Sequence, residues 1–139
     1  MEKTFEIIDH TADIGIVSYG ADVKQTFSNA ALGLFSLITE LDSIKENVQR
    51  EIKLSSQDRE SLLVEWLNEL IYIFDVEHIV FKRFEFDYFN ERELKVRCFG
   101  DKINPKQQGI KREVKAATYH MLAISKENNG YKAQVIFDI

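Results

Sequence analysis

The stretch that decides the fold spans residues 56–77 and reads SQDRESLLVEWLNELIYIFDVE. Its apolar side chains recur every three or four residues, which places them on one face of an α-helix; they are Leu63, Trp66, Leu67, Leu70, Ile71 and Phe74. Ser56 can cap this helix, and Asp58 and Glu60 favour its positive amino-terminal end. Because a helix with one apolar face needs a second layer to cover it, the stretch predicts a layered fold.

Two further helices and seven strands are predicted around this helix. An earlier helix begins at Asp22, with Gln25 completing a capping box, and runs to Ile38. A shorter helix is predicted over Arg112–Met121. Alternation of apolar and polar residues predicts the strands Thr4–Ile8, Ile14–Tyr19, Val48–Leu54, Phe84–Tyr88, Leu94–Cys98, Leu122–Ser125 and Tyr131–Phe137.

The resulting order is β-β-α-β-α-β-β-α-β-β. Strands that alternate on one face need a helical layer on that face alone. The sequence therefore predicts an α+β two-layer sandwich, a largely antiparallel sheet with three helices packed on one face. With 139 residues, one proline and no linker of low complexity, we expect a single domain over residues 1–139.

Composition narrows the class of function. The net charge is −5, whereas proteins that grip nucleic-acid phosphates carry a basic stripe, so we expect little or no direct nucleic-acid binding. A single cysteine, Cys98, fits a reducing compartment. No apolar run approaches the roughly 20 residues of a membrane helix, and no secretory signal opens the chain. We expect a cytoplasmic protein with a protein partner.

Three oxygen donors suggest a cation site. Asp138 is followed by Ile139, whose terminal carboxylate lies close to it, and bringing Asp13 beside this pair would gather three hard donors suited to Ca²⁺ or Mg²⁺. By spacing alone the signal is weak, because an aspartate before a strand often bonds its own backbone. A well-patterned strand that closes on Asp-Ile is expected to use that end.

Three other residues could support such a site, and each has a simpler interpretation. His10 precedes Asp13 by three residues and could instead orient the loop. His120, at the end of the predicted third helix, could be an ordinary core or surface histidine. Lys115 could be solvated, or could act as a counter-charge or bind a phosphate. No nucleophile motif or phosphate loop occurs, and Cys98 in its alternating strand is expected to be a packed thiol.

Four strings, taken together and in order, resemble the archease family. They are HTADIG at residues 10–15, LLVEWLNELIY at 62–72, VKAATYH at 114–120 and VIFDI at 135–139. The resemblance covers essentially the whole chain. It does not extend to the loop around residues 42–47 or to the tract 102–109.

The resemblance implies a function. Archeases are small accessory proteins of the RNA ligases that splice tRNA, which use GTP and divalent metal and become guanylylated on a histidine. It implies a non-catalytic activator that promotes guanylylation and turnover of the ligase and broadens its nucleotide use. It further implies a bound divalent ion, Ca²⁺ first, with Mg²⁺ or Mn²⁺ as alternatives. Its ligands carry over to Asp13, Asp138 and Ile139, and the family's basic residue to Lys115.

Two other classes of function stay open at this stage. A metal-dependent hydrolase or nuclease acting alone would need a general base, for which His10 and His120 are the candidates. A chaperone-like binding module would use the metal for structure alone.

Overall fold

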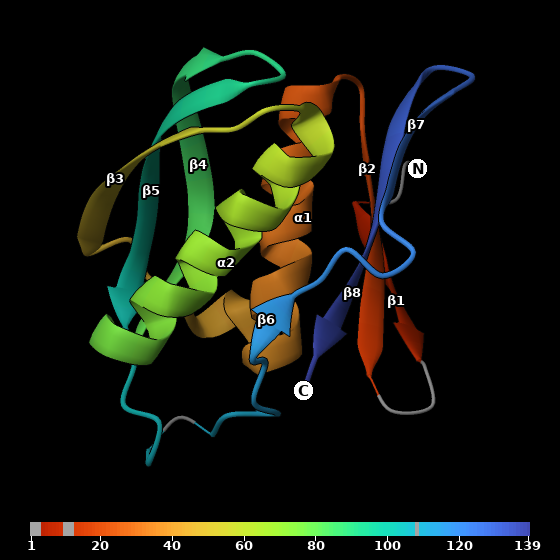
Figure 1. Cartoon of the computed structure of the whole chain (residues 1–139). Coiled ribbons are helices and arrows are strands. Elements are labelled where there is room, and N and C mark those ends of the chain that lie inside the picture. Colours follow the sequence, from red (N-terminus) through yellow and green to blue (C-terminus); the bar gives the residue numbers. More distant parts are fainter. Residues whose placement is uncertain (1–3, 10–12, 108) are drawn as a thin grey trace.

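The computed structural model describes residues 4–9, 13–107 and 109–139, and its strands form two antiparallel sheets (Figure 1). The first sheet has the order β1-β2-β8-β6, and β7 also pairs with β8. Its strands are β1 (Phe5–Asp9), β2 (Ile14–Gly20), β6 (Ala116–Ala117), β7 (Ala123–Glu127) and β8 (Gly130–Asp138). The second sheet has the order β3-β5-β4, formed by β3 (Val48–Ser55), β5 (Glu93–Lys102) and β4 (Ile79–Phe89).

The two long helices, α1 (Val23–Ile38) and α2 (Arg59–Glu77), lie between these sheets (Figure 1). α1 packs against β2 of the first sheet and β4 of the second, and α2 packs against β6, β3 and α1. Both layers therefore share one hydrophobic core, whose largest buried side chains are Trp66, Phe27, Phe35, Phe81 and Phe137. The predicted α+β class is confirmed. The prediction of one sheet covered on one face is wrong, because alternation shows that a strand has a buried face but not which strands share a sheet.

The helix ends follow the capping rules. Asp22 Oδ1 accepts a hydrogen bond from the Gln25 amide at 2.7 Å, which is the predicted cap of α1. α2 is capped by Asp58, which accepts from the Ser61 amide at 2.8 Å, so the prediction of Ser56 as its cap is wrong. No helix in the described part of the chain is long and apolar enough to cross a membrane.

The predicted helix over Arg112–Met121 is not formed. In its place the described residues contain β6 and a turn, while the other helical segment is a short 3-10 turn at Leu41–Ser43. The Lys115 amide donates to the Asp138 carbonyl at 2.8 Å, and the Thr118 amide donates to the Ile136 carbonyl at 3.0 Å. Pairing with β8 has overridden the helical spacing of this segment, which was carried by few apolar residues.

The short strand β6 is held on its second edge by a side chain of α2. The Ala117 amide donates to Asn68 Oδ1 at 2.8 Å, and Asn68 Nδ2 donates to the Ala117 carbonyl at 3.3 Å. The amide group of Asn68 thus replaces a neighbouring strand. Because Ala117 is buried, these main-chain groups have little access to water.

We expect Asn68→Ala to lower the free energy of unfolding by about 1–3 kcal/mol, because it leaves a buried N–H and C=O without partners. Urea denaturation of the variant measures the change. Asn47→Ala is the matched control, since Asn47 is exposed and forms an exposed hydrogen bond with Asp101, and we expect it to change stability by less than about 0.5 kcal/mol. Equal losses in both variants would contradict the role given to Asn68.

Candidate metal centre at the end of the first sheet

The pairing of β2 with β8 brings Asp13 and Asp138 to the same place. The last pair of this antiparallel ladder is Ile14 with Phe137. Asp13 directly precedes Ile14 and Asp138 directly follows Phe137. The two aspartates therefore occupy the next opposing positions, where Cα atoms of paired strands are about 4.5–5.5 Å apart.

Strand alternation places both carboxylates on the face away from the helices. Ile14 and Phe137 are buried against the core, so their neighbours Asp13 and Asp138 point the other way. A Cβ atom at Gly15 would lie 2.6 Å from Ile136 Cδ1, so the missing side chain at Gly15 gives Ile136 its room beside Asp138.

Exposure differs among the three predicted ligands. Asp138 is exposed and Ile139 is 45% exposed, while Asp13 is half-buried and its Oδ1 atom is buried. Asp9 lies near them but pairs with Ile14, so it shares the helix-facing side. Among the described residues no three His, Cys, Asp or Glu side chains form a metal-binding group. The third donor of the predicted site is instead the main-chain carboxylate of Ile139.

The residues present fit a hard divalent cation. Carboxylates at directly opposing positions of a sheet repel each other, and a third carboxylate nearby increases this repulsion. A cation between them removes it, and Ca²⁺ and Mg²⁺ prefer oxygen donors of this kind. The juxtaposition of Asp13 and Asp138 is a feature of the structure, whereas their role as metal ligands stays a prediction.

β6 places Lys115 beside this group. Ala116 is paired with Asp138, and the Lys115 amide bonds the Asp138 carbonyl. The Lys115 side chain is exposed and takes part in no ion pair among the described residues. The backbone of Lys115 therefore lies next to Asp138, and its exposed side chain leaves the ammonium group accessible.

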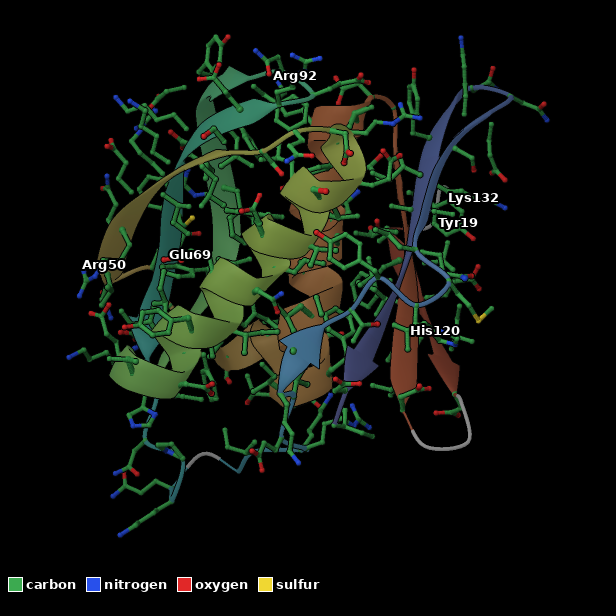
Figure 2. The ribbon with its side chains drawn as sticks, in the orientation of Figure 1. Tyr19, Arg50, Glu69, Arg92, His120 and Lys132 are labelled. Carbon is green, nitrogen blue, oxygen red and sulfur yellow. The ribbon has the colours of Figure 1, made fainter. Side chains whose placement is uncertain are left out.

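Of the two histidines proposed to support the site, the structure describes only His120. His10 lies outside the described residues. His120 is exposed on the turn after β6, whose Thr118 hydroxyl donates to the Ile136 carbonyl at 2.8 Å (Figure 2). The turn is thus bonded to β8 two residues before Asp138.

The basic residues before β6 have a structural task that the sequence did not indicate. Lys111 Nζ and Arg112 Nη1 donate to the carbonyls of Ser36 and Leu37 at 3.1 and 2.9 Å, and the Lys111 amide donates to Ile38. These carbonyls belong to the last turn of α1, where cations are favoured and carbonyls lack helical partners. The side chains of Lys111 and Arg112 are therefore engaged at the end of α1, whereas no such bond engages the side chain of Lys115 among the described residues.

A surface hollow of about 700 Å³ lies at the other end of the first sheet, beside the turn between β7 and β8, and is lined by Tyr19, Asn29 and Tyr131 among others. The Tyr19 hydroxyl donates to Glu6, and this bond and partial burial raise the pKa of Tyr19 to about 12. Figure 2 labels Tyr19 and Lys132 in this region. None of the predicted site residues that the structure describes lines the hollow.

Comparisons with known proteins agree on one family. The sequence profile described as Archease protein family (MTH1598/TM1083) matches residues 5–139. Protein archease of Methanosarcina barkeri is 43% identical over 99% of this chain and 97% of its own length. Protein archease of Sulfolobus acidocaldarius is 36% identical over 97% of this chain and 98% of its own.

Solved structures agree with this result. The solution structure of Methanobacterium thermoautotrophicum protein 1598 has a TM-score of 0.83 and 36% identity, covering 98% of this chain and 99% of that one. The crystal structure of a Thermotoga maritima archease, described as a possible chaperone, shares the fold with a TM-score of 0.65 and 23% identity, covering 100% and 98%. We call Asp13, Asp138 and the carboxylate of Ile139 the carboxylate rim. The fold that carries this rim is that of a small α+β protein with two sheets around two helices. The chain belongs to the archease family.

Cys98 is expected to be chemically inert in the folded protein. The thiol is buried within β5, and this burial raises its pKa far above the usual range, so little nucleophilic thiolate forms. A thiol-reactive chromogenic disulfide at pH 8 should label one thiol per chain in guanidinium and almost none in native buffer. Rapid labelling of native protein would contradict the packed environment.

Proposed function

We propose that this protein is a non-catalytic, cytoplasmic activator of a tRNA-splicing RNA ligase, and that it promotes guanylylation and turnover of the catalytic subunit. Membership of the archease family supports the partner. The observation that carries the mechanism is the opposition of Asp13 and Asp138 beyond the last pair of the β2–β8 ladder. The net charge of −5 favours a protein partner over direct contact with RNA.

The three carboxylates would hold the divalent ion at the rim of the sheet. Asp13 and Asp138 would contribute side-chain oxygens, and Ile139 its main-chain carboxylate, with Ca²⁺ the first candidate and Mg²⁺ or Mn²⁺ alternatives. When bound, the ion supplies positive charge that can stabilise charge developing on nucleotide phosphates. The backbone on both sides of Asp138 is fixed by β2 and β6, so its donors are held at one place on the surface.

Lys115 would add a second positive charge at the same rim. Its exposed ammonium group can balance the carboxylates or contact a phosphate of the nucleotide in the ligase. Contacts of this type recognise phosphates and not the base, which agrees with broader nucleotide use by the activated ligase.

We expect Asp13→Asn and Asp138→Asn each to reduce stimulation of ligase guanylylation at least about tenfold, because each removes a ligand charge without changing side-chain size. The measurement is transfer of labelled GMP to the ligase at sub-stoichiometric activator. Asp42→Asn is the control, since Asp42 is exposed in the 3-10 turn far along the chain from the rim. Full stimulation of guanylylation by both Asp13→Asn and Asp138→Asn would contradict the metal-dependent mechanism.

Thermal unfolding should distinguish stabilisation by bound metal from the stability of the fold without metal. Without metal, Asp138→Asn should be as stable as the wild type or more stable by a few tenths of a kcal/mol, because a repulsive cross-strand pair is lost. Added Ca²⁺ should raise the Tm of the wild type and of Asp42→Asn, but not of Asp138→Asn. An identical Ca²⁺ response in all three proteins would rule out this site.

The same variants distinguish the other classes of function. A chaperone-like module with a structural metal predicts that Asp13→Asn loses stimulation only in proportion to the folded protein. A hydrolase predicts that the purified protein alone turns over RNA or phosphoesters, and that Asp13→Asn abolishes this activity.

A further inference from the structure

The outward face of α2 exposes two large apolar side chains on neighbouring turns. Tyr72 is 61% exposed and Val76 is 60% exposed, although both lie in a helix whose opposite face is fully buried. Glu65 precedes Tyr72 by seven residues, so the three side chains form one stripe along the helix. We call the set of Glu65, Glu69, Tyr72, Asp75 and Val76 the α2 stripe; Figure 2 labels Glu69 on this helix.

The acidic residues of the α2 stripe form no ion pair with another residue that the structure describes. None of the ion pairs formed by the described residues includes Glu65, Glu69 or Asp75. Burial and the neighbouring Glu113 carboxylate raise the pKa of Asp75, so Glu113 extends the negative region beyond the helix.

The outer face of the second sheet differs from the α2 stripe in the pairing of its charges. Its charges pair with one another: Arg83 bonds Glu46 and Glu85, and Arg97 bonds Glu85 and Asp87. The Arg83 guanidinium also lies 3.9 Å from the centre of the Phe99 ring. One exposed face is thus self-neutralised, whereas the α2 stripe combines unpaired negative charge with exposed apolar area.

The α2 stripe is continuous with the carboxylate rim. Asn68, between Glu65 and Tyr72, bonds Ala117 of β6, and the preceding residue of β6, Ala116, is paired with Asp138. A single two-residue strand therefore separates the helix from the rim, and α2 and β6 lie side by side in Figure 1.

We propose that the α2 stripe is the docking surface for a basic, partly apolar surface of the ligase, and that it aligns the carboxylate rim with the ligase's nucleotide pocket; this rests on the proposed function. Charge complementarity selects the occupant. RNA and anionic lipid are repelled by the acidic residues, and so is a second copy of the same stripe. A basic protein surface satisfies the carboxylates while Tyr72 and Val76 bury apolar area.

The test is the affinity of the purified full-length chain for its RNA ligase, measured by titration calorimetry with and without added salt. Glu65→Lys/Glu69→Lys and Tyr72→Ser/Val76→Ser should each weaken binding at least about tenfold. The charge variant should also weaken the salt dependence. Matched controls elsewhere are Asp42→Lys/Glu93→Lys and Tyr88→Ser, which replace exposed residues of the 3-10 turn at Leu41–Ser43 and of the second sheet and should bind like the wild type. All changes are at or near the surface, and circular dichroism verifies folding.

Each outcome bears on the proposal. Wild-type affinity in both stripe variants, or equal weakening in the controls, overturns it, as does a wild type that does not bind the ligase. A wild-type dimer that Tyr72→Ser/Val76→Ser converts to a monomer, with ligase affinity unchanged, assigns the stripe to a second copy and also overturns it. Asp13→Asn should bind normally yet fail to stimulate; full stimulation by Asp13→Asn would refute the metal mechanism while leaving the docking surface intact.

Discussion

The antiparallel pairing of β2 with β8 is the constraint on which the rest of the structure depends. It joins residues 14–20 to residues 131–137, and so brings the two ends of the described chain into one sheet. β1, β6 and β7 all pair with one of these two strands, and α1 packs across them. The ladder also fixes the rim, because one further step at its end sets Asp13 against Asp138. A slip of one residue between the two strands would place the two carboxylates on opposite faces of the sheet.

Local patterns in the sequence were sufficient for the elements that carry their own periodicity. The boundaries of α1 follow from its apolar spacing and the Asp22 cap, and the hairpin of β4 and β5 follows from alternation, although both strands run further than predicted. The segment around Val114 failed because its hydrogen bonds go to β8 and Asn68, partners remote in sequence. Such tertiary pairing leaves no periodic signal in the ten residues of Arg112–Met121. The same limit hid the use of Lys111 and Arg112 at the end of α1.

The site was predictable to a different degree. The chemistry of Asp13 and Asp138 can be read from residue type, but their juxtaposition requires the strand register. The resemblance of four short strings to the archease family indicated these residues, and the register supplies a physical reason for their meeting. Tyr72 and Val76 lie outside the apolar face that helical spacing predicted for residues 56–77, and both are exposed in the structure.

The amide of Asn68 also has a consequence for self-association. A sheet normally ends in a row of open main-chain groups, which can recruit a strand from another molecule. At β6 that row is two residues long, and a single carboxamide occupies its Ala117 donor and acceptor. This edge therefore offers no template for cross-molecule strand addition. The end of the first sheet at β6 is therefore protected from edge-to-edge pairing with a second molecule.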